Sequence, residues 1–229
     1  MSEPKINPLH ELIKYLTYFE ELGYPWLPRY REFSFIFNRE NFGLKKGDLE
    51  DLFNQISRCQ SCFLHRIRKQ PVFEKRGSPI DLMLIGDFPS KEDDFYGVPF
   101  SGPLGETLQK MLLSIGLKRE DFYVTLVVKC KPPAGRLPEE EEIQACKKYL
   151  LQEIMLLKPR LILALGNLPV KVFLEKPVTL SSLRSKPFKY KNSMIIFTYH
   201  PSYMLKNPQV KRFIWEDLKT FRKLYDETF

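Results

Sequence analysis

The chain has 229 residues, of which 43% are hydrophobic, so it is long enough to bury a sizeable core and is not disordered as a whole. Charged residues make up 28%, and no apolar run approaches the roughly 20 residues of a membrane-spanning helix, which argues against a membrane protein. The formal net charge of +8 suits a polyanionic partner such as nucleic acid. The N-terminus has no secretory pattern, so we expect a cytoplasmic protein, in a compartment where disulfides are rare.

Residues 1–48 are expected to form an aromatic-rich N-terminal extension, and residues 49–229 the main domain. Residues 9–19 carry apolar side chains at helical spacing. Residues 26–42 interleave aromatic rings with arginines, a composition that suits either a surface that stacks nucleic-acid bases or an extension packed on the main domain. Of these two, we favour the packed extension.

Strands and helices are expected to alternate from residue 80 onwards. Branched and apolar runs predict strands at residues 80–86, 123–129, 160–165 and 194–199. Apolar stripes at helical spacing predict a short helix ahead of Cys59 and longer helices at residues 104–116, 139–157, 167–175 and 208–226. This alternation predicts an α/β fold whose parallel sheet is covered by helices on both faces. Residues 176–193 are expected to form a basic loop or hairpin.

The segment from residue 80 to residue 105 joins the first expected strand to a loop rich in turn-forming residues. The strand ends at the sequence Gly-Asp-Phe-Pro-Ser, residues 86–90, and a polar loop then leads to Phe100 and to a helix that begins near Leu104. In open α/β sheets, ligands bind beyond the carboxyl ends of the strands. The segment is therefore either an ordinary crossover or one wall of a ligand site.

The four cysteines of the chain need an explanation other than disulfides. Cys59 and Cys62 form a C-x-x-C pair in a polar, basic stretch, Cys130 ends an expected strand, and Cys146 lies within an expected helix. Four thiolates are the number that holds one [4Fe–4S] cluster, and they also suit one zinc ion. Buried, unligated thiols are the alternative for the single residues. For the set as a whole, we favour metal binding.

Six local patterns occur in a fixed order along the chain. They are C-x-x-C-x-L-x-x-x-R at residues 59–68, LMLIGDFPS at 82–90, GVPFSGPLG at 97–105, VVKCKPPAGRLPEEEEIQAC at 127–146, LILALG at 161–166 and HPSYMLK at 200–206. In this order they closely resemble the family 4 uracil-DNA glycosylases, the iron–sulfur branch of the uracil-DNA glycosylase superfamily. The resemblance covers residues from about 49 to 226 and leaves out the N-terminal stretch.

The resemblance implies a three-layer α/β/α fold with a four-stranded parallel sheet. It implies one [4Fe–4S] cluster, held by Cys59, Cys62, Cys130 and Cys146. It also implies an enzyme that hydrolyses the N-glycosidic bond of uracil, or of another deaminated base, in DNA during base-excision repair. The target base must first rotate out of the stack, because the bond is unreachable inside a duplex. DNA that contains a deaminated base is the expected partner, and we expect a monomer.

The resemblance also implies roles for single residues. Those that would line the base pocket are Gly86, Asp87, Phe88, Phe100, Leu126 and His200. Asp87 belongs to the loop that would position the attacking water, and Phe100 would stack on the flipped base. His200 would stabilise negative charge on the uracil oxygen as the bond breaks, a contribution that is usually the largest in such catalysis. The residues that would contact DNA are Arg136, Ser202, Tyr203, Met204 and Lys206. Of the loop that contains most of them, Tyr203, Met204 or Leu205 would fill the space that the flipped base leaves in the duplex, and Lys206 would lie near a phosphate.

The sequence departs from the family pattern at two places. Where the family has Gly-Glu-Ala-Pro-Gly, residues 86–90 keep a shorter carboxylate in Asp87, place the larger Phe88 beside it, and have Ser90 in place of a glycine that lets backbone approach closely. Leu126 replaces the asparagine that reads the imide edge of uracil in the family, and leucine forms no such hydrogen bonds. Leu126 therefore predicts weak activity on uracil.

Two alternative functions follow from the same residues. One is a DNA-binding module that keeps the fold and the cluster but has little or no turnover, which Leu126 and Phe88 favour. The other is a small-molecule enzyme on the same scaffold. The basic composition and the HPSYMLK sequence of residues 200–206 disfavour that second alternative.

Overall fold

We analysed a computed structural model, which describes residues 48–76, 80–174 and 178–229. All of these residues belong to one compact unit, Leu44–Phe229. The expected extension lies outside the described residues except for its last residue, so its separation from a main domain at residues 49–229 stays a prediction. Among the helices of the described ranges, none is both long and apolar enough to cross a membrane.

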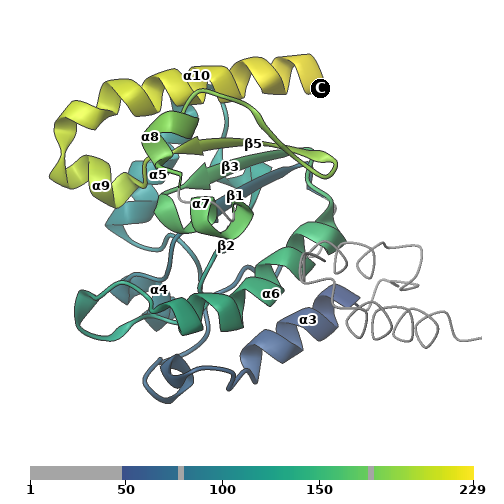
Figure 1. The fold of residues 1–229 in the computed structure, drawn as a ribbon, viewed down its shortest axis with the longest axis vertical. Coiled ribbons are helices and arrows are strands. Elements are labelled where there is room, and N and C mark those ends of the chain that lie inside the picture. Colours follow the sequence, from purple (N-terminus) through teal and green to yellow (C-terminus); the bar gives the residue numbers. More distant parts are fainter. Residues whose placement is uncertain (1–47, 77–79, 175–177) are drawn as a thin grey trace, which may run out of the picture. The chain divides into compact units, whose positions relative to one another are not determined.

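A five-stranded sheet with the order β2-β1-β3-β5-β4 forms the middle of this unit (Figure 1). Four strands are parallel, as expected: β1 (Leu82–Gly86), β2 (Phe122–Leu126), β3 (Leu161–Leu165) and β5 (Ser193–Thr198). The fifth strand, β4 (Phe188–Tyr190), pairs antiparallel with β5 and corrects the expected count of four. It arises because Phe188–Tyr190 turns back to pair with β5 as a hairpin. Residues 176–193 were expected to form a basic loop or hairpin, and within the described part of that range residues 180–183 form a short helix instead.

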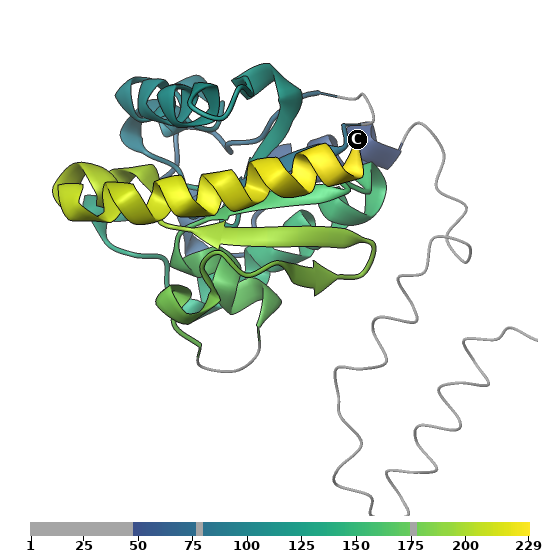
Figure 2. The same ribbon diagram turned by 90° about the horizontal axis from the view of Figure 1, so that it is seen from above.

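Helices cover both faces of the sheet, which confirms the three layers. One face carries α3 (Asp48–Ser57), α6 (Glu140–Leu157) and α7 (Asn167–Phe173), and the other carries α5 (Pro103–Leu113) and α10 (Lys211–Thr228). Figure 1 shows α10 along one side of the strands and α6 with α3 on the other, and Figure 2 shows α10 running over the sheet when it is seen from above.

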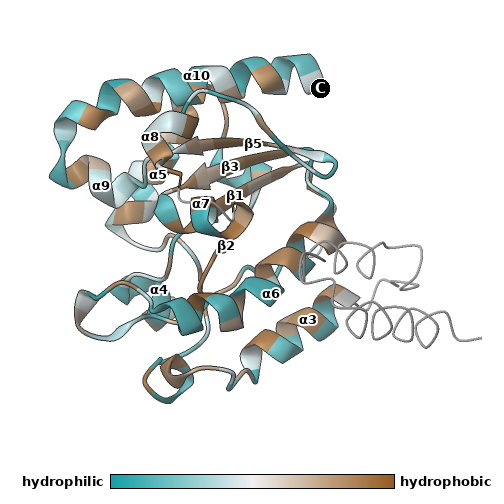
Figure 3. Cartoon of the chain, in the orientation of Figure 1, coloured by the Kyte–Doolittle hydropathy of each residue, from teal (hydrophilic) through white to brown (hydrophobic). Residues whose placement is uncertain are grey.

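Alternating side chains of the strands divide the hydrophobic core into two clusters. In β1, Met83 and Ile85 pack toward α6 and α7, whereas Leu82 and Leu84 pack toward α5 and α10. This alternation follows from the two-residue period of a strand. Figure 3 shows the result: the parallel strands are mostly hydrophobic, whereas the helices α3, α6 and α10 mix hydrophobic and hydrophilic residues. The sheet is therefore buried on both faces, as parallel sheets require.

Three short helices complete the fold: α4 (Lys91–Tyr96), α8 (Leu180–Leu183) and α9 (Pro201–Lys206). The sequence analysis predicted none of these three helices, and it expected a loop or hairpin where α8 lies. The helix α4 begins at Ser90, whose hydroxyl accepts the backbone N–H of Asp93 while the Asp93 carboxylate accepts the backbone N–H of Ser90. The helix α9 begins at His200, whose ring accepts the backbone N–H of Ser202. Both helices start beyond the carboxyl ends of strands, where they shape the candidate site.

Candidate active site and cysteine pocket

The carboxylate of Asp87 is held at the edge of the sheet by the chain that follows the neighbouring strand β3. Its Oδ1 atom accepts the backbone N–H of Leu168, at the start of α7, over 2.9 Å. Gly166 adopts a φ of +101° and lies so close that any side chain there would overlap the carboxylate. Burial raises the pKa of Asp87 to about 7, and the hydrogen bond from Leu168 opposes that shift only in part.

His200 follows β5 at the same edge of the sheet. Its Nδ1 atom accepts the backbone N–H of Ser202 over 3.3 Å and lies 2.7 Å from the hydroxyl oxygen of that residue. Burial lowers the pKa of His200 to about 4, so the imidazole is neutral at pH 7. Because Nδ1 is an acceptor, the single ring proton of the neutral imidazole is on Nε2. The histidine is therefore a neutral hydrogen-bond donor.

Phe100 and Leu126 meet at the backbone of Gly86. A Cβ atom on Gly86 would lie 2.7 Å from Cζ of Phe100 and 2.8 Å from Cδ2 of Leu126, so only glycine fits between them. Phe100 also lies beside His200, with ring centroids 5.5 Å apart. Phe100 and Leu126 are 7% and 1% exposed. These buried side chains pack together behind the site.

Six of the predicted residues line one cleft of about 460 Å³. They are Asp87, Phe88, His200, Ser202, Tyr203 and Lys206. Two predicted DNA contacts point elsewhere in this structure. The guanidinium of Arg136 is paired with the Glu142 carboxylate, with Nη2 and Oε1 2.6 Å apart, although its neighbours in the chain line the cleft. Met204 lines a separate groove between α5 and α10.

The cleft also contains residues that the sequence analysis missed. Asn167 is exposed and lines the cleft directly after Gly166, and Tyr199 lines it directly before His200. Both residues come just after the carboxyl end of a parallel strand. Because ligands bind at this edge of an open α/β sheet, their positions after the predicted strands could have identified them.

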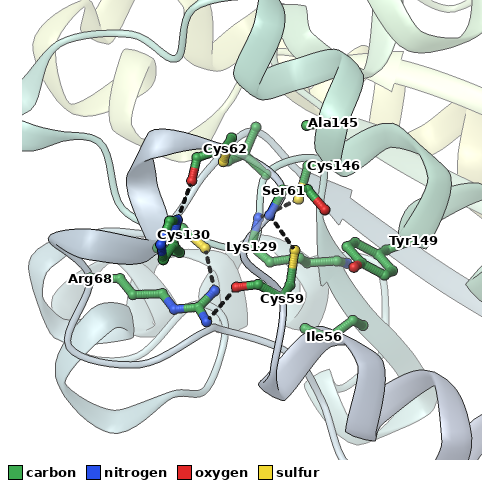
Figure 4. Close-up of a pocket in the computed structure, with 12 residues that line it drawn as sticks. Ile56, Cys59, Ser61, Cys62, Arg68, Lys129, Cys130, Ala145, Cys146 and Tyr149 are labelled. Carbon is green, nitrogen blue, oxygen red and sulfur yellow. Dashed lines mark hydrogen bonds between the residues drawn. The ribbon is translucent and has the colours of Figure 1, made fainter.

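All four cysteines line a second pocket (Figure 4). Cys59 and Cys62 follow α3, Cys130 follows β2, and Cys146 lies on α6. Figure 4 shows their sulfur atoms around one common space. Within the described ranges, no three histidine, cysteine, aspartate or glutamate side chains are arranged to hold a single metal ion. The fold therefore brings the four predicted thiols together in one pocket.

Hydrogen-bond donors surround these thiols. The guanidinium of Arg68 donates through Nη1 to the Cys130 sulfur over 3.0 Å and through Nη2 to the backbone carbonyl of Cys59 over 2.9 Å. The backbone N–H of Lys129 donates to the Cys146 sulfur over 3.2 Å. Donors of this kind favour sulfur atoms that carry negative charge.

Most of the chain is similar to proteins of one known family. Residues 75–219 match the family described as the uracil DNA glycosylase superfamily. The chain is 35% identical over 182 residues to the type-4 uracil-DNA glycosylase of Pyrobaculum aerophilum, an alignment that covers 76% of this chain and 93% of that protein. The chain belongs to the uracil DNA glycosylase superfamily.

Other relatives within the superfamily carry the same name. The chain is 32% identical over 184 residues to the type-4 uracil-DNA glycosylase of Archaeoglobus fulgidus, covering 77% of this chain and 92% of that protein. It is 34% identical over 175 residues to the type-4 enzyme of Thermotoga maritima, covering 75% of this chain and 91% of that protein. These similarities confirm the predicted resemblance to the type-4 branch of the superfamily.

Proposed function

We propose that the protein is a DNA glycosylase that hydrolyses the N-glycosidic bond of uracil, or of another deaminated base, in base-excision repair. The observation that carries this proposal is the cleft at the carboxyl ends of β1 and β5, which brings a buried carboxylate, Asp87, and a neutral histidine, His200, into one site. The similarity to three proteins named type-4 uracil-DNA glycosylase supports the choice of DNA as substrate.

His200 is the proposed electrophilic group. As the bond from the sugar to the base breaks, negative charge develops on the base and its carbonyl oxygen. A neutral imidazole whose Nδ1 atom is occupied by Ser202 presents Nε2–H to that oxygen. Burial keeps the pKa of His200 far below 7, so no proton has to be removed before it acts. Removal by mutation of one fixed hydrogen-bond donor at a developing charge typically lowers the rate by about 10²- to 10³-fold.

Asp87 is the proposed base that orients the attacking water. Its carboxylate is fixed from one side by the backbone N–H of Leu168 and by the close approach of Gly166. A carboxylate in a buried site binds a water proton more strongly than an exposed one, because burial raises its pKa. The base-binding residues proposed beside it are Gly86, Phe88, Phe100 and Leu126.

The second part of the proposal is a [4Fe–4S] cluster bound by Cys59, Cys62, Cys130 and Cys146. The donor set fits it, because the four thiols line one pocket and four thiolates are the number that holds one such cluster. Each thiolate of such a cluster binds a different iron, whereas one zinc ion needs four sulfurs at about 2.3 Å from a single centre. When bound, the cluster supplies iron–thiolate bonds that crosslink the chain after α3 to the loop after β2 and to α6.

DNA is proposed to lie across the mouth of the cleft. Ser202, Tyr203 and Lys206 are exposed there, on α9, and Lys206 supplies positive charge for a phosphate group. Arg136 and Met204 remain proposed contacts, although neither side chain lines the cleft in this structure. We further propose a monomer that acts in the cytoplasm, where free thiols stay reduced.

A cleavage assay tests the enzyme. Labelled oligonucleotides with a single uracil, hypoxanthine or xanthine are incubated with the wild-type protein, and alkali-labile abasic sites are then measured. We expect cleavage of at least one of these bases, no cleavage of a thymine control, and loss of all cleavage in the His200→Ala variant. If the wild-type protein binds these oligonucleotides and releases no base, the enzyme proposal is wrong.

A non-catalytic DNA-binding module is the second candidate, and one observation favours it. Leu126 is buried against Gly86 at the position where the family reads uracil, so the space for a polar contact is filled by hydrocarbon. The same assay separates the two functions. Binding without release of any base, in a protein that holds iron, supports the module.

A further inference from the structure

Two tyrosines form a stack at the mouth of the cleft. Tyr199 follows β5 and Tyr203 lies on α9, and their ring centroids are 5.4 Å apart with the ring planes at 24°. Both rings line the cleft that contains Asp87 and His200. Tyr203 is 46% exposed, so much of its ring remains open to solvent.

A partly buried cation, Arg184, lies against the inner tyrosine. The guanidinium of Arg184 lies 5.3 Å from the centroid of the Tyr199 ring and 4.5 Å from that of Phe213. Arg184 is itself fixed, because its Nε and Nη2 atoms donate to the two oxygens of the Asp217 carboxylate over 2.9 and 3.2 Å. Thr198 donates to the same carboxylate over 2.6 Å. Tyr199 is therefore a rigid support for Tyr203.

Three neighbouring side chains of α9, those of Tyr203, Met204 and Leu205, are at least partly exposed and differ in their contacts. Met204 faces the groove between α5 and α10, and Leu205 is 60% exposed. Tyr203 differs from both, because its ring already stacks on Tyr199. A side chain that enters a DNA duplex as a wedge has to leave its contacts in the protein. A ring that stays stacked on Tyr199 is better suited to stack on a base than to fill the place of a base inside the duplex.

We propose that Tyr203, supported by Tyr199 and Arg184, is a stacking platform for an unpaired nucleobase beside the flipped one. The ligand class is single-stranded DNA, whose bases offer a π-face whatever their identity. Lys206 lines the same cleft and supplies charge for the adjacent phosphate. The position of this base next to the target rests on the proposed glycosylase function, whereas the stacking itself does not depend on cleavage.

A double-mutant cycle between protein and DNA tests the platform. The full-length protein is titrated with fluorescent single strands that contain no uracil, in which each nucleotide in turn is replaced by an abasic analogue. In the wild-type protein, we expect one internal position at which loss of the base weakens binding by roughly 5- to 150-fold, the equivalent of about 1–3 kcal/mol for base stacking on an aromatic ring. Tyr203→Leu should bind more weakly and show no dependence on the base at that position, whereas Tyr203→Phe should behave as the wild type.

Tyr96 provides a matched control, because it is exposed at 63% and lies on α4, outside the cleft. Tyr96→Leu should leave both the affinity and the base dependence unchanged. If Tyr203→Leu keeps the base dependence of the wild type, or if the wild-type protein does not bind single strands, the platform is refuted. Because these strands contain no uracil, a protein that fails to excise any base can still pass this test. A second series with one uncleavable uracil analogue should place the sensitive position directly beside it, and any other place contradicts the proposed location.

Discussion

The side chain of Leu126 packs directly against the α-carbon of Gly86, its register partner on the adjacent strand β1. Phe100 closes on the same atom, and the three residues form one layer behind the candidate active site. The resemblance places at position 126 an asparagine that would read the edge of the base, and this chain has a buried leucine there. Under the proposed function, we therefore expect recognition of a base to depend on the backbone near Asp87, on Phe100 and on His200.

Replacing Leu126 with Asn should increase uracil excision. A polar reader discriminates between bases by far larger factors than a hydrophobic wall does, so we expect a rise of about 10-fold or more in the single-turnover rate. The gain should come with a loss of stability of about 1–3 kcal/mol, because the free protein buries an amide without partners. Leu126→Ala is the control, since it makes room without adding a polar group. Equal rates for the two variants would show that space, and not hydrogen bonding, limits the reaction.

The pH dependence of the rate should follow Asp87. Its pKa is raised to about 7, and a base must be ionised, so the single-turnover rate should rise with pH up to about 7 and then level off. His200 should not contribute to this profile above pH 5, because its pKa is lowered to about 4. Asp87→Asn should give a low rate that does not change between pH 5 and 9. A profile in Asp87→Asn that still rises toward pH 7 would exclude Asp87 as the base.

The same two residues should affect stability in opposite directions as the pH changes. The folded state keeps the proton of Asp87 up to about pH 7, whereas an unfolded aspartate loses it near 3.8, so this residue makes stability fall as the pH rises between these values. His200 binds a proton near 6.5 when unfolded but only near 4 when folded, so it makes stability rise with pH over that window. In Asp87→Asn, urea denaturation should therefore show a steeper loss of stability on acidification from pH 6.5 to 4. In His200→Gln the slope should change in the other direction, so acidification over the same range should cost less stability than in the wild type.

Much of this site follows from the sequence, but its contacts do not. The apolar runs of the four parallel strands and the C-x-x-C pattern at residues 59–62 are local signals, and they predicted the strands and the thiol set directly. The short helix α9 was missed because six residues give no amphipathic period, and its start depends on a cap from the His200 ring. The pairing of Arg136 with Glu142 depends on three-dimensional packing, which a linear pattern does not contain.

Arg68 should tune the proposed cluster and should not be needed to form it. Its guanidinium donates to the Cys130 sulfur, and loss of a cationic donor to a ligand sulfur lowers the reduction potential of a cluster. In anaerobically purified protein, we expect about four irons per chain in both the wild type and Arg68→Met, with a more negative potential in the variant. Arg66→Met, two residues earlier in the chain and with an exposed side chain, should leave the potential unchanged. Cys130→Ser should instead lose iron and stability.

Finding zinc at one per chain in the wild type would contradict the cluster itself. Equal potentials in Arg68→Met and Arg66→Met would contradict only the role of Arg68. Voltammetry and iron analysis on the same preparations separate these two outcomes.

Lys129 and Glu153 form an ion pair that is buried within the domain, with Nζ and Oε2 2.7 Å apart and exposed side-chain fractions of 2% and 0%. The pair joins the residue before Cys130 to the helix α6 that carries Cys146, and Thr125 donates to the same carboxylate over 2.8 Å. Lys129→Met leaves a buried charge on Glu153 without its cation, which should cost about 3–5 kcal/mol in the free energy of urea unfolding. Removing both charges, in Lys129→Met with Glu153→Leu, should recover part of that loss.

The exposed pair between Arg222 and Asp226 is the control, and Arg222→Ala should cost less than about 1 kcal/mol. A cost for Lys129→Met no larger than that of the control would mean that the buried pair does not hold the two cysteine-bearing segments together.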